Sequence, residues 1–104
     1  MLHLTLRQLK VFESVARNLS YSRAADELHL TQPAVSMQIK QLEDNISLPL
    51  FEHLGKRIYL TEAGRELYQY SRAISQQLAD MEVAFTHKRR GKNSQESIYI
   101  CYIH

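Results

Sequence analysis

The chain has 104 residues, 44% of them apolar, with three glycines, two prolines and a net charge of +2. This length allows one small domain with a modest core, and so little glycine and proline argues against a β-sandwich or a disordered chain. The single Cys101 excludes an internal disulfide, and no segment has the roughly 18 unbroken apolar residues of a membrane span. We therefore expect a soluble cytoplasmic protein that contacts no membrane.

Three helices are expected in the first half of the chain. Apolar residues at helical spacing predict the first over 6–17, and a second is expected over 21–28 with Ser20 as its N-cap. The sequence "HLTQP" then interrupts the pattern. Pro33 disfavours helical geometry in the residue before it but suits the first turn of a new helix, and Thr31 can cap that helix.

The third expected helix is amphipathic over its whole length. Its apolar residues are spaced by four, three and four, so they fall in one narrow stripe that is predicted to be buried. The opposite face starts with polar or neutral side chains, and residues 31–41 contain no acid. The buried stripe is Val35, Ile39, Leu42 and Ile46, and the outward face carries Pro33, Ser36, Met37, Lys40 and Asp44.

The sequence "LPLFEHLGKRIYLT" predicts a short β-hairpin. Gly55 supplies the turn, Lys56 and Arg57 lie at its tip, and residues 53–61 contain no acid. The side chains expected to face inward are Phe51, Leu54, Ile58 and Leu60.

A long helix is expected over 62–91, with Thr61 as its N-cap. Its apolar stripe continues for about six turns, which is more than a small domain can cover, so the helix requires a partner. The simplest partner is a second copy of the chain, which makes the protein a homodimer. The residues predicted to form this contact are Leu67, Tyr70, Ile74, Leu78, Met81 and Phe85.

The pattern divides the chain into three parts. Residues 1–61 are expected to form three helices and a hairpin, 62–91 a dimerisation helix, and 92–104 a polar linker followed by the stub of a further domain. The strand-like "IYICYIH" is the reason for expecting that further domain.

A helix pair followed by a basic hairpin is typical of a winged DNA-binding domain. The first turns of a helix placed in the major groove must carry short hydrogen-bonding side chains. Gln32 can bond adenine bidentately, Lys40 can reach guanine or phosphate, and Thr31 and Ser36 are short enough to reach base edges. The alternative is that this helix is only a surface helix of a small bundle.

Two further segments can hold phosphate. Lys56 and Arg57 could reach minor-groove phosphates, although a solvated turn would look the same. Ser20, Ser22 and Arg23 begin the second helix, where backbone N–H groups and hydroxyls bind phosphate, although plain capping would also explain them.

Catalytic and metal-binding patterns are missing from the sequence. It contains no paired carboxylates, nucleophile elbow or phosphate-cradling glycine loop, so we expect neither an enzyme nor a cofactor. Cys101 and His104 are too few to hold zinc, which takes three or four protein ligands. The histidines are scattered without metal-site spacing: His3, His29, His53, His87 and His104.

The residues resemble a known family over positions 4 to about 90. The pattern "F…VA…S…RAA..L..TQPA.S..I..LE…..PLF…….LT.AG" is similar, almost position for position, to the N-terminal domain of LysR-type transcriptional regulators. The sequence is most similar to the subgroup that regulates Calvin-cycle carboxylase (RuBisCO) operons.

This resemblance implies a mainly α fold, a winged helix-turn-helix with its central motif at about 21–41, followed by a long dimerisation helix. It also implies a tetrameric full-length protein that binds interrupted palindromes at promoters, contacts RNA polymerase and senses a small effector through a C-terminal domain. We expect the protein to act in the bacterial cytoplasm, on the nucleoid. The resemblance assigns base reading to Thr31, Gln32, Pro33, Ser36, Met37 and Lys40, and DNA-backbone contacts to Ser20, Ser22, Arg23, His53, Lys56 and Arg57.

Two positions depart from the family pattern. Many members have arginine where this chain has Met37, so we expect an apolar contact there, with a thymine methyl group. Members often have arginine at His53 as well, and a histidine would contact phosphate in a pH-dependent way. The rival interpretation of the whole chain is a helical oligomerisation module without specific DNA readout.

Overall fold

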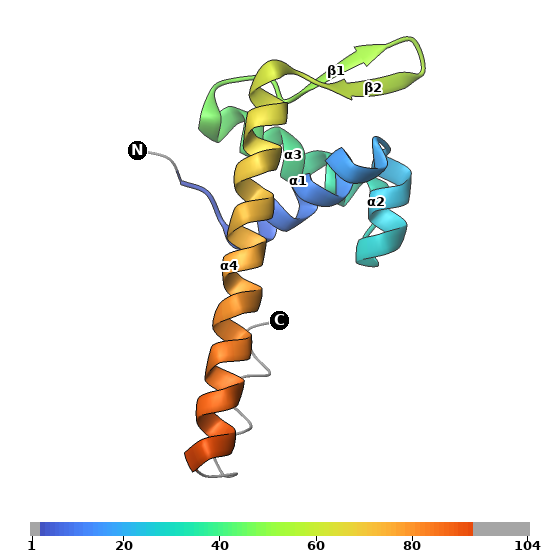
Figure 1. Cartoon of the computed structure of the whole chain (residues 1–104). Helices are drawn as coiled ribbons and strands as arrows, with labels where there is room; N and C mark the ends of the chain where they lie inside the picture. Colours follow the sequence, from blue (N-terminus) through green and yellow to red (C-terminus); the bar gives the residue numbers. More distant parts are fainter. Residues whose placement is uncertain (1–2, 93–104) are drawn as a thin grey trace. The chain divides into compact units, whose positions relative to one another are not determined.

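The computed structural model describes residues 3–92, with side chains described as far as residue 90. The elements follow in the order α1 (Leu6–Asn18), α2 (Tyr21–Leu28), α3 (Gln32–Ile46), β1 (Phe51–Leu54), β2 (Arg57–Leu60) and α4 (Glu62–Lys92). The chain divides into two compact units, residues 1–71 and 72–104, and α4 begins in the first of them. The predicted mainly α, winged helix-turn-helix architecture is confirmed (Figure 1).

Hydroxyl side chains begin the four helices of the described part of the chain. Ser20 accepts a backbone N–H of α2 at 3.1 Å, and Thr31 accepts one of α3 at 3.3 Å, so both predicted caps are confirmed. The cap predicted at Thr61 is confirmed as well, with a backbone N–H of α4 at 3.0 Å. Thr5 caps α1 in a capping box with Gln8, whose side chain accepts the Thr5 backbone N–H at 3.2 Å.

The core of the first unit lies where α1, α2 and α3 meet. The small side chains of Ala24 and Ala25 are buried there, which lets the two neighbouring helices approach α2 closely. The predicted stripe of α3 is buried as far as Leu42, and Ile46 packs against the core while half-buried. The buried core residues are Val11, Phe12, Val15, Ala16, Ala24, Ala25, Val35, Ile39, Leu42, Leu50, Phe51 and Ile58.

The hairpin register corrects one prediction. Paired residues of antiparallel strands share a face, and His53 pairs with Ile58 while Leu54 pairs with Arg57. Ile58 is buried as predicted, so the face that carries Leu54 points away from the core. Leu54 is 61% exposed, and its predicted inward orientation was wrong.

The start of α4 packs tightly on the segment before the hairpin. The Leu50 carbonyl accepts the Thr61 backbone N–H at 3.0 Å, and the Thr61 hydroxyl donates to the Pro49 carbonyl at 2.7 Å. A Cβ atom on Gly64 would lie only 2.2 Å from the Leu50 oxygen, so this position has no room for a side chain. Leu67 also packs against the core of its own unit.

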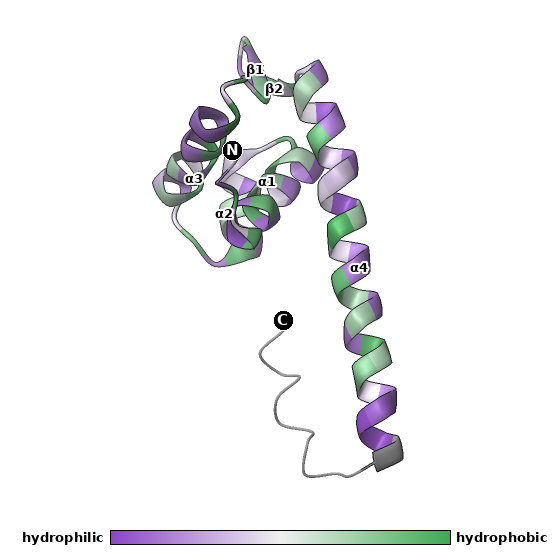
Figure 2. Cartoon of the chain, turned by 90° about the vertical axis from the view of Figure 1, so that its left-hand side faces the viewer, coloured by the Kyte–Doolittle hydropathy of each residue, from purple (hydrophilic) through white to green (hydrophobic). Residues whose placement is uncertain are grey.

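Within the second unit, the described turns of α4 carry apolar residues on an exposed helix. Ile74, Met81 and Phe85 are 37%, 39% and 53% exposed, and hydrophobic and hydrophilic colours alternate along the helix in Figure 2. No helix among residues 3–92 is long and apolar enough to cross a membrane. The predicted stub at 92–104, including Cys101 and His104, lies outside the described residues apart from Lys92, the last residue of α4.

Candidate nucleic-acid interface

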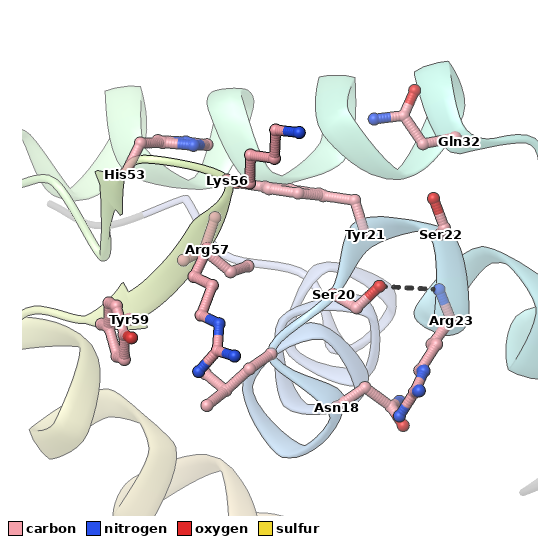
Figure 3. A pocket seen from close by; sticks show the side chains of 12 residues that line it. Asn18, Ser20, Tyr21, Ser22, Arg23, Gln32, His53, Lys56, Arg57 and Tyr59 are labelled. Atoms are coloured by element: carbon pink, nitrogen blue, oxygen red, sulfur yellow. Dashed lines mark hydrogen bonds between the residues drawn. The ribbon is translucent and has the colours of Figure 1, made fainter.

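A groove of about 750 Å³ runs between the start of α2 and the β-hairpin. Figure 3 shows side chains from both elements around this one space. The groove belongs entirely to the first unit. Its lining residues are Asn18, Leu19, Ser20, Tyr21, Ser22, Arg23, Gln32, His53, Lys56, Arg57, Ile58 and Tyr59.

The groove collects the residues predicted to contact a DNA backbone. Three come from the start of α2 and three from the hairpin, and Gln32 joins them from the first turn of α3. Residues separated by about thirty positions in the sequence thus line one surface. The six predicted backbone contacts that line it are Ser20, Ser22, Arg23, His53, Lys56 and Arg57.

The charge of the groove is of one sign. Arg23, Lys56 and Arg57 supply guanidinium and ammonium groups, and none of the groove's described lining residues is a carboxylate. Ser22 and Arg23 are exposed in the first turn of α2, which contains no acid. A phosphate at this helix start would meet backbone N–H groups, hydroxyls and cations together.

The first turns of α3 present the predicted base-reading residues. Thr31, Pro33, Met37 and Lys40 are exposed, whereas the rear face of the helix is buried. These four residues, together with the half-buried Ser36, do not line the groove.

Gln32 connects the groove with this face of α3. Its side-chain amide donates to the Ser36 hydroxyl at 3.1 Å, which orients both groups on the outward side of the helix. Its amide oxygen, which takes no part in this bond, and the second N–H of its amide nitrogen can still bond a base edge.

An aromatic stack joins the two sides of the groove. The rings of Tyr21 and His53 are parallel to within 3°, with centroids 6.2 Å apart, and Tyr21 also meets Phe51 at 6.0 Å in a tilted arrangement. Burial raises the pKa of the Tyr21 hydroxyl, and the nearby Glu43 carboxylate raises it further, so the hydroxyl remains a hydrogen-bond donor. His53 is therefore held by α2 although it is exposed.

Five residues of the groove were not predicted to belong to it: Asn18, Leu19, Tyr21, Ile58 and Tyr59. Tyr21 is half-buried and packs against the core. The available signal was its position between Ser20 and Ser22, because a tyrosine at a helix start can bury part of its ring while the rest of the side chain lines the surface. Asn18 donates to the Ser14 carbonyl at 2.8 Å and so closes the end of α1 beside the groove.

A polar contact fixes α1 against α2. The Ser14 hydroxyl donates to the Glu27 carboxylate at 2.6 Å, and Arg17 forms an ion pair with the same carboxylate. These contacts, first that of Ser14 and then that of Arg17, lower the pKa of Glu27. The Arg17 pKa is raised in return, chiefly by its hydrogen bond to Glu27.

Among residues 3–92, no three histidine, cysteine or carboxylate side chains lie close enough together to hold a metal ion.

A family comparison matches this part of the chain. Residues 6–65 match the family described as bacterial regulatory helix-turn-helix protein, lysR family. The chain belongs to the LysR family. The match spans α1 to the start of α4 and so includes every residue that lines the groove.

Two relatives of this LysR-family chain are named as transcriptional regulators of the RuBisCO operon. It is 68% identical over 81 residues to the RuBisCO operon transcriptional regulator of Allochromatium vinosum, covering 78% of this chain and 27% of that protein. It is 57% identical over 65 residues to the regulator of the same name in Acidithiobacillus ferrooxidans. That match covers 62% of this chain and 21% of that protein. The chain thus spans about a quarter of the length of the curated relatives it matches.

A solved structure of a protein–DNA complex contains a chain with a similar fold. The BenM_DBD/catB site 1 DNA complex contains a chain that is 30% identical to this one, with a TM-score of 0.78. The superposition covers 86% of this chain and 99% of that chain. That protein was therefore solved together with DNA.

Proposed function

We propose that this chain binds double-stranded DNA sequence-specifically, as the DNA-binding part of a transcriptional regulator of RuBisCO operon genes. Membership of the LysR family supports the regulatory role, and the names of the relatives support the choice of genes. The similarity to the BenM_DBD chain solved with DNA supports the ligand.

One observation carries the proposal. The start of α2 and the hairpin line one cationic groove without a carboxylate among its described lining residues, and Gln32 links this groove to the exposed face of α3. A DNA duplex has a matching arrangement, because its phosphates lie beside the base edges that are exposed in the major groove. The roles follow from position: α3 reads bases while the groove holds the backbone.

The base-reading role falls on side chains of the first three turns of α3. Gln32 would bond an adenine, Lys40 a guanine or a phosphate, and Met37 a thymine methyl group. Thr31, Pro33 and Ser36 complete this set. Phosphate contacts fall on Ser20, Ser22, Arg23, His53, Lys56 and Arg57.

We further infer that the chain acts as a dimer through α4. The exposed apolar side chains of this helix support the inference, because isolated apolar stripes are stabilised by a second helix. The contact set would be Tyr70, Ile74, Leu78, Met81 and Phe85. Leu67 would contribute less, because it packs on its own unit.

For the whole protein we infer the wider arrangement typical of the family. It comprises a DNA-binding domain over 1–61, a dimerisation helix over 62–91 and a C-terminal domain that binds a small effector. We further infer a tetramer that binds interrupted palindromes at promoters, contacts RNA polymerase and acts on the bacterial nucleoid.

The test is an in vitro selection of duplexes from a random pool with this 104-residue chain at physiological salt. Enrichment of an interrupted palindrome would support specific, dimeric DNA binding, and the separation of its arms would report the geometry that α4 sets. Selection without enrichment, combined with binding that weakens uniformly as salt rises, would contradict the proposal and favour an oligomerisation module.

A further inference from the structure

Leu19 has an unfavourable backbone conformation at the edge of the groove. It is the C-cap residue of α1, with φ 48° and ψ 41°, in the left-handed region that residues with a Cβ atom rarely adopt. Glycine or asparagine occupies such caps at lower cost. His29 and Ser47 end α2 and α3 in the same conformation. Of these three caps in the described part of the chain, Leu19 is the one that lines the groove.

The side chain of Leu19 is also unfavourably placed for solvation. It is 42% exposed, and the groove around it is lined mainly by polar and cationic residues. The other aliphatic residue of the lining, Ile58, is buried in the core. Within residues 3–92, Leu19 is neither in the core nor among the partly buried apolar side chains packed on it.

Neither the backbone nor the core therefore accounts for a leucine at this position. An apolar contact made only when the groove is occupied would account for it, because binding would then cover a surface that is exposed in the free protein. Strained backbone at the edge of a binding surface is a known way of holding a side chain in place for a ligand.

The apolar part of a DNA backbone is the sugar. Phosphates and deoxyriboses alternate along a strand, so a side chain directly beside a phosphate-binding helix start meets a sugar. Leu19 precedes Ser20, whose hydroxyl caps α2, and it shares the groove with Arg57. Such contacts fix the register of a protein on DNA without reading sequence.

We propose that Leu19 packs against a deoxyribose of the DNA backbone and so positions the neighbouring phosphate at the start of α2. This inference rests on the proposed DNA-binding function. Leu19 is a positioning residue of the interface, and its contact is independent of the base at that step.

The experiment separates this contact from a structural role by using backbone strain. In Leu19→Asn the new side chain tolerates the left-handed conformation, but the apolar surface is lost. In Leu19→Met the side chain at this position remains apolar. Ser47→Asn is the matched control, because it changes a left-handed cap that does not line the groove among the described residues. Melting temperatures and dissociation constants are measured for the 104-residue chain, on the selected duplex and on a scrambled duplex.

We expect Leu19→Asn to melt at the same or a higher temperature than the wild type, yet to bind both duplexes about three- to tenfold more weakly. Leu19→Met should bind within about twofold of the wild type, since it restores apolar contact area. Ser47→Asn should bind both duplexes as the wild type does.

Three results would overturn the inference. Unchanged binding by Leu19→Asn would mean that no contact exists, and weaker binding accompanied by a lower melting temperature would mean that the leucine is structural. Weaker binding to the selected duplex but not to the scrambled duplex would mean that Leu19 contacts a base, for example the methyl group of a thymine, and not a sugar. Failure of the wild type to bind either duplex is a separate outcome, because it would contradict the proposed function itself.

Discussion

The ring of Tyr21 lies parallel to that of His53, with an angle of 3° between them, and so links the start of α2 to strand β1. Each residue belongs to a different side of the groove, and Tyr21 is anchored on the core through Phe51. The distance between the two segments that we propose to bind phosphate is therefore set by an aromatic contact as well as by the core beneath it.

We expect Tyr21→Leu to destabilise the domain by about 1 kcal/mol, because it retains apolar volume but loses the aromatic contacts. The free energy of unfolding in urea measures this cost. The NMR signals of the His53 ring protons should shift at the same time, since the ring current of Tyr21 is removed. Tyr21→Phe is the control and should retain both properties, and His53 signals that stay in place in Tyr21→Leu would contradict the stack.

Much of this fold could be predicted because its signals are local. A hydroxyl residue before an apolar stripe specifies a helix start by itself, and Ser20, Thr31 and Thr61 were recognised in this way. The stripe of α3 is equally local, since its spacing alone shows which side is buried.

The error at Leu54 and the missed place of Tyr21 in the groove concern relations between separate segments. Leu54 was assigned to the core on its hydrophobicity, but the strand register places it on the face opposite to Phe51. The place of Tyr21 in the groove depends on where His53 arrives from the hairpin, and neither segment contains that information. The left-handed conformation of Leu19 is a local feature, but it could not be predicted from the sequence either. Such caps are usually glycine or asparagine, and a leucine does not indicate one.

Gln32 is expected to determine one base pair of the recognised site. Gln32→Ala should reduce discrimination at that position by about 1–3 kcal/mol, because a bidentate bond to a base is lost. Competition binding against duplexes substituted at each position measures this change. Gln41→Ala removes another exposed glutamine of α3 and should leave discrimination intact. Equal weakening by Gln32→Ala on every duplex would show that the residue contacts only the backbone.

The cations of the hairpin are expected to contribute affinity but no sequence preference. Lys56→Ala and Arg57→Ala should each lower the slope of the logarithm of affinity against the logarithm of salt by about one, because each removes one phosphate contact. Titrations at several salt concentrations give this slope. Lys10→Ala provides a control, since Lys10 is exposed on α1 and does not line the groove among the described residues. A slope that neither hairpin variant changes would mean that these two side chains are exposed to solvent and contact no phosphate.

Gly64 is expected to be irreplaceable for steric reasons. In Gly64→Ala the new Cβ atom would meet the Leu50 carbonyl oxygen at 2.2 Å, so the start of α4 would have to move. The expected loss of stability is about 2 kcal/mol, typical of overpacking, measured by urea unfolding. Gly55→Ala is the comparison, because nothing lies within 4 Å of its Cβ position and only its φ of +63° opposes a side chain. A Gly64→Ala variant as stable as the wild type would contradict the close approach of these two segments.

The contact of Glu27 with Ser14 and Arg17 is expected to make stability depend on pH. Because the pKa of Glu27 is lowered in the folded state, its contribution is present above the ordinary value of 4.5 and is lost as the pH falls through the folded value. Glu27→Gln lacks this titration, so its stability deficit relative to the wild type should be largest at neutral pH and should shrink below pH 4.5. Urea midpoints measured between neutral and acidic pH test this. Ser14→Ala removes the hydrogen bond that lowers this pKa most, so its acid-dependent loss of stability should be smaller and should be complete nearer to the ordinary value. A deficit of Glu27→Gln that is constant over the whole range would show that the carboxylate contributes by its shape rather than by its charge.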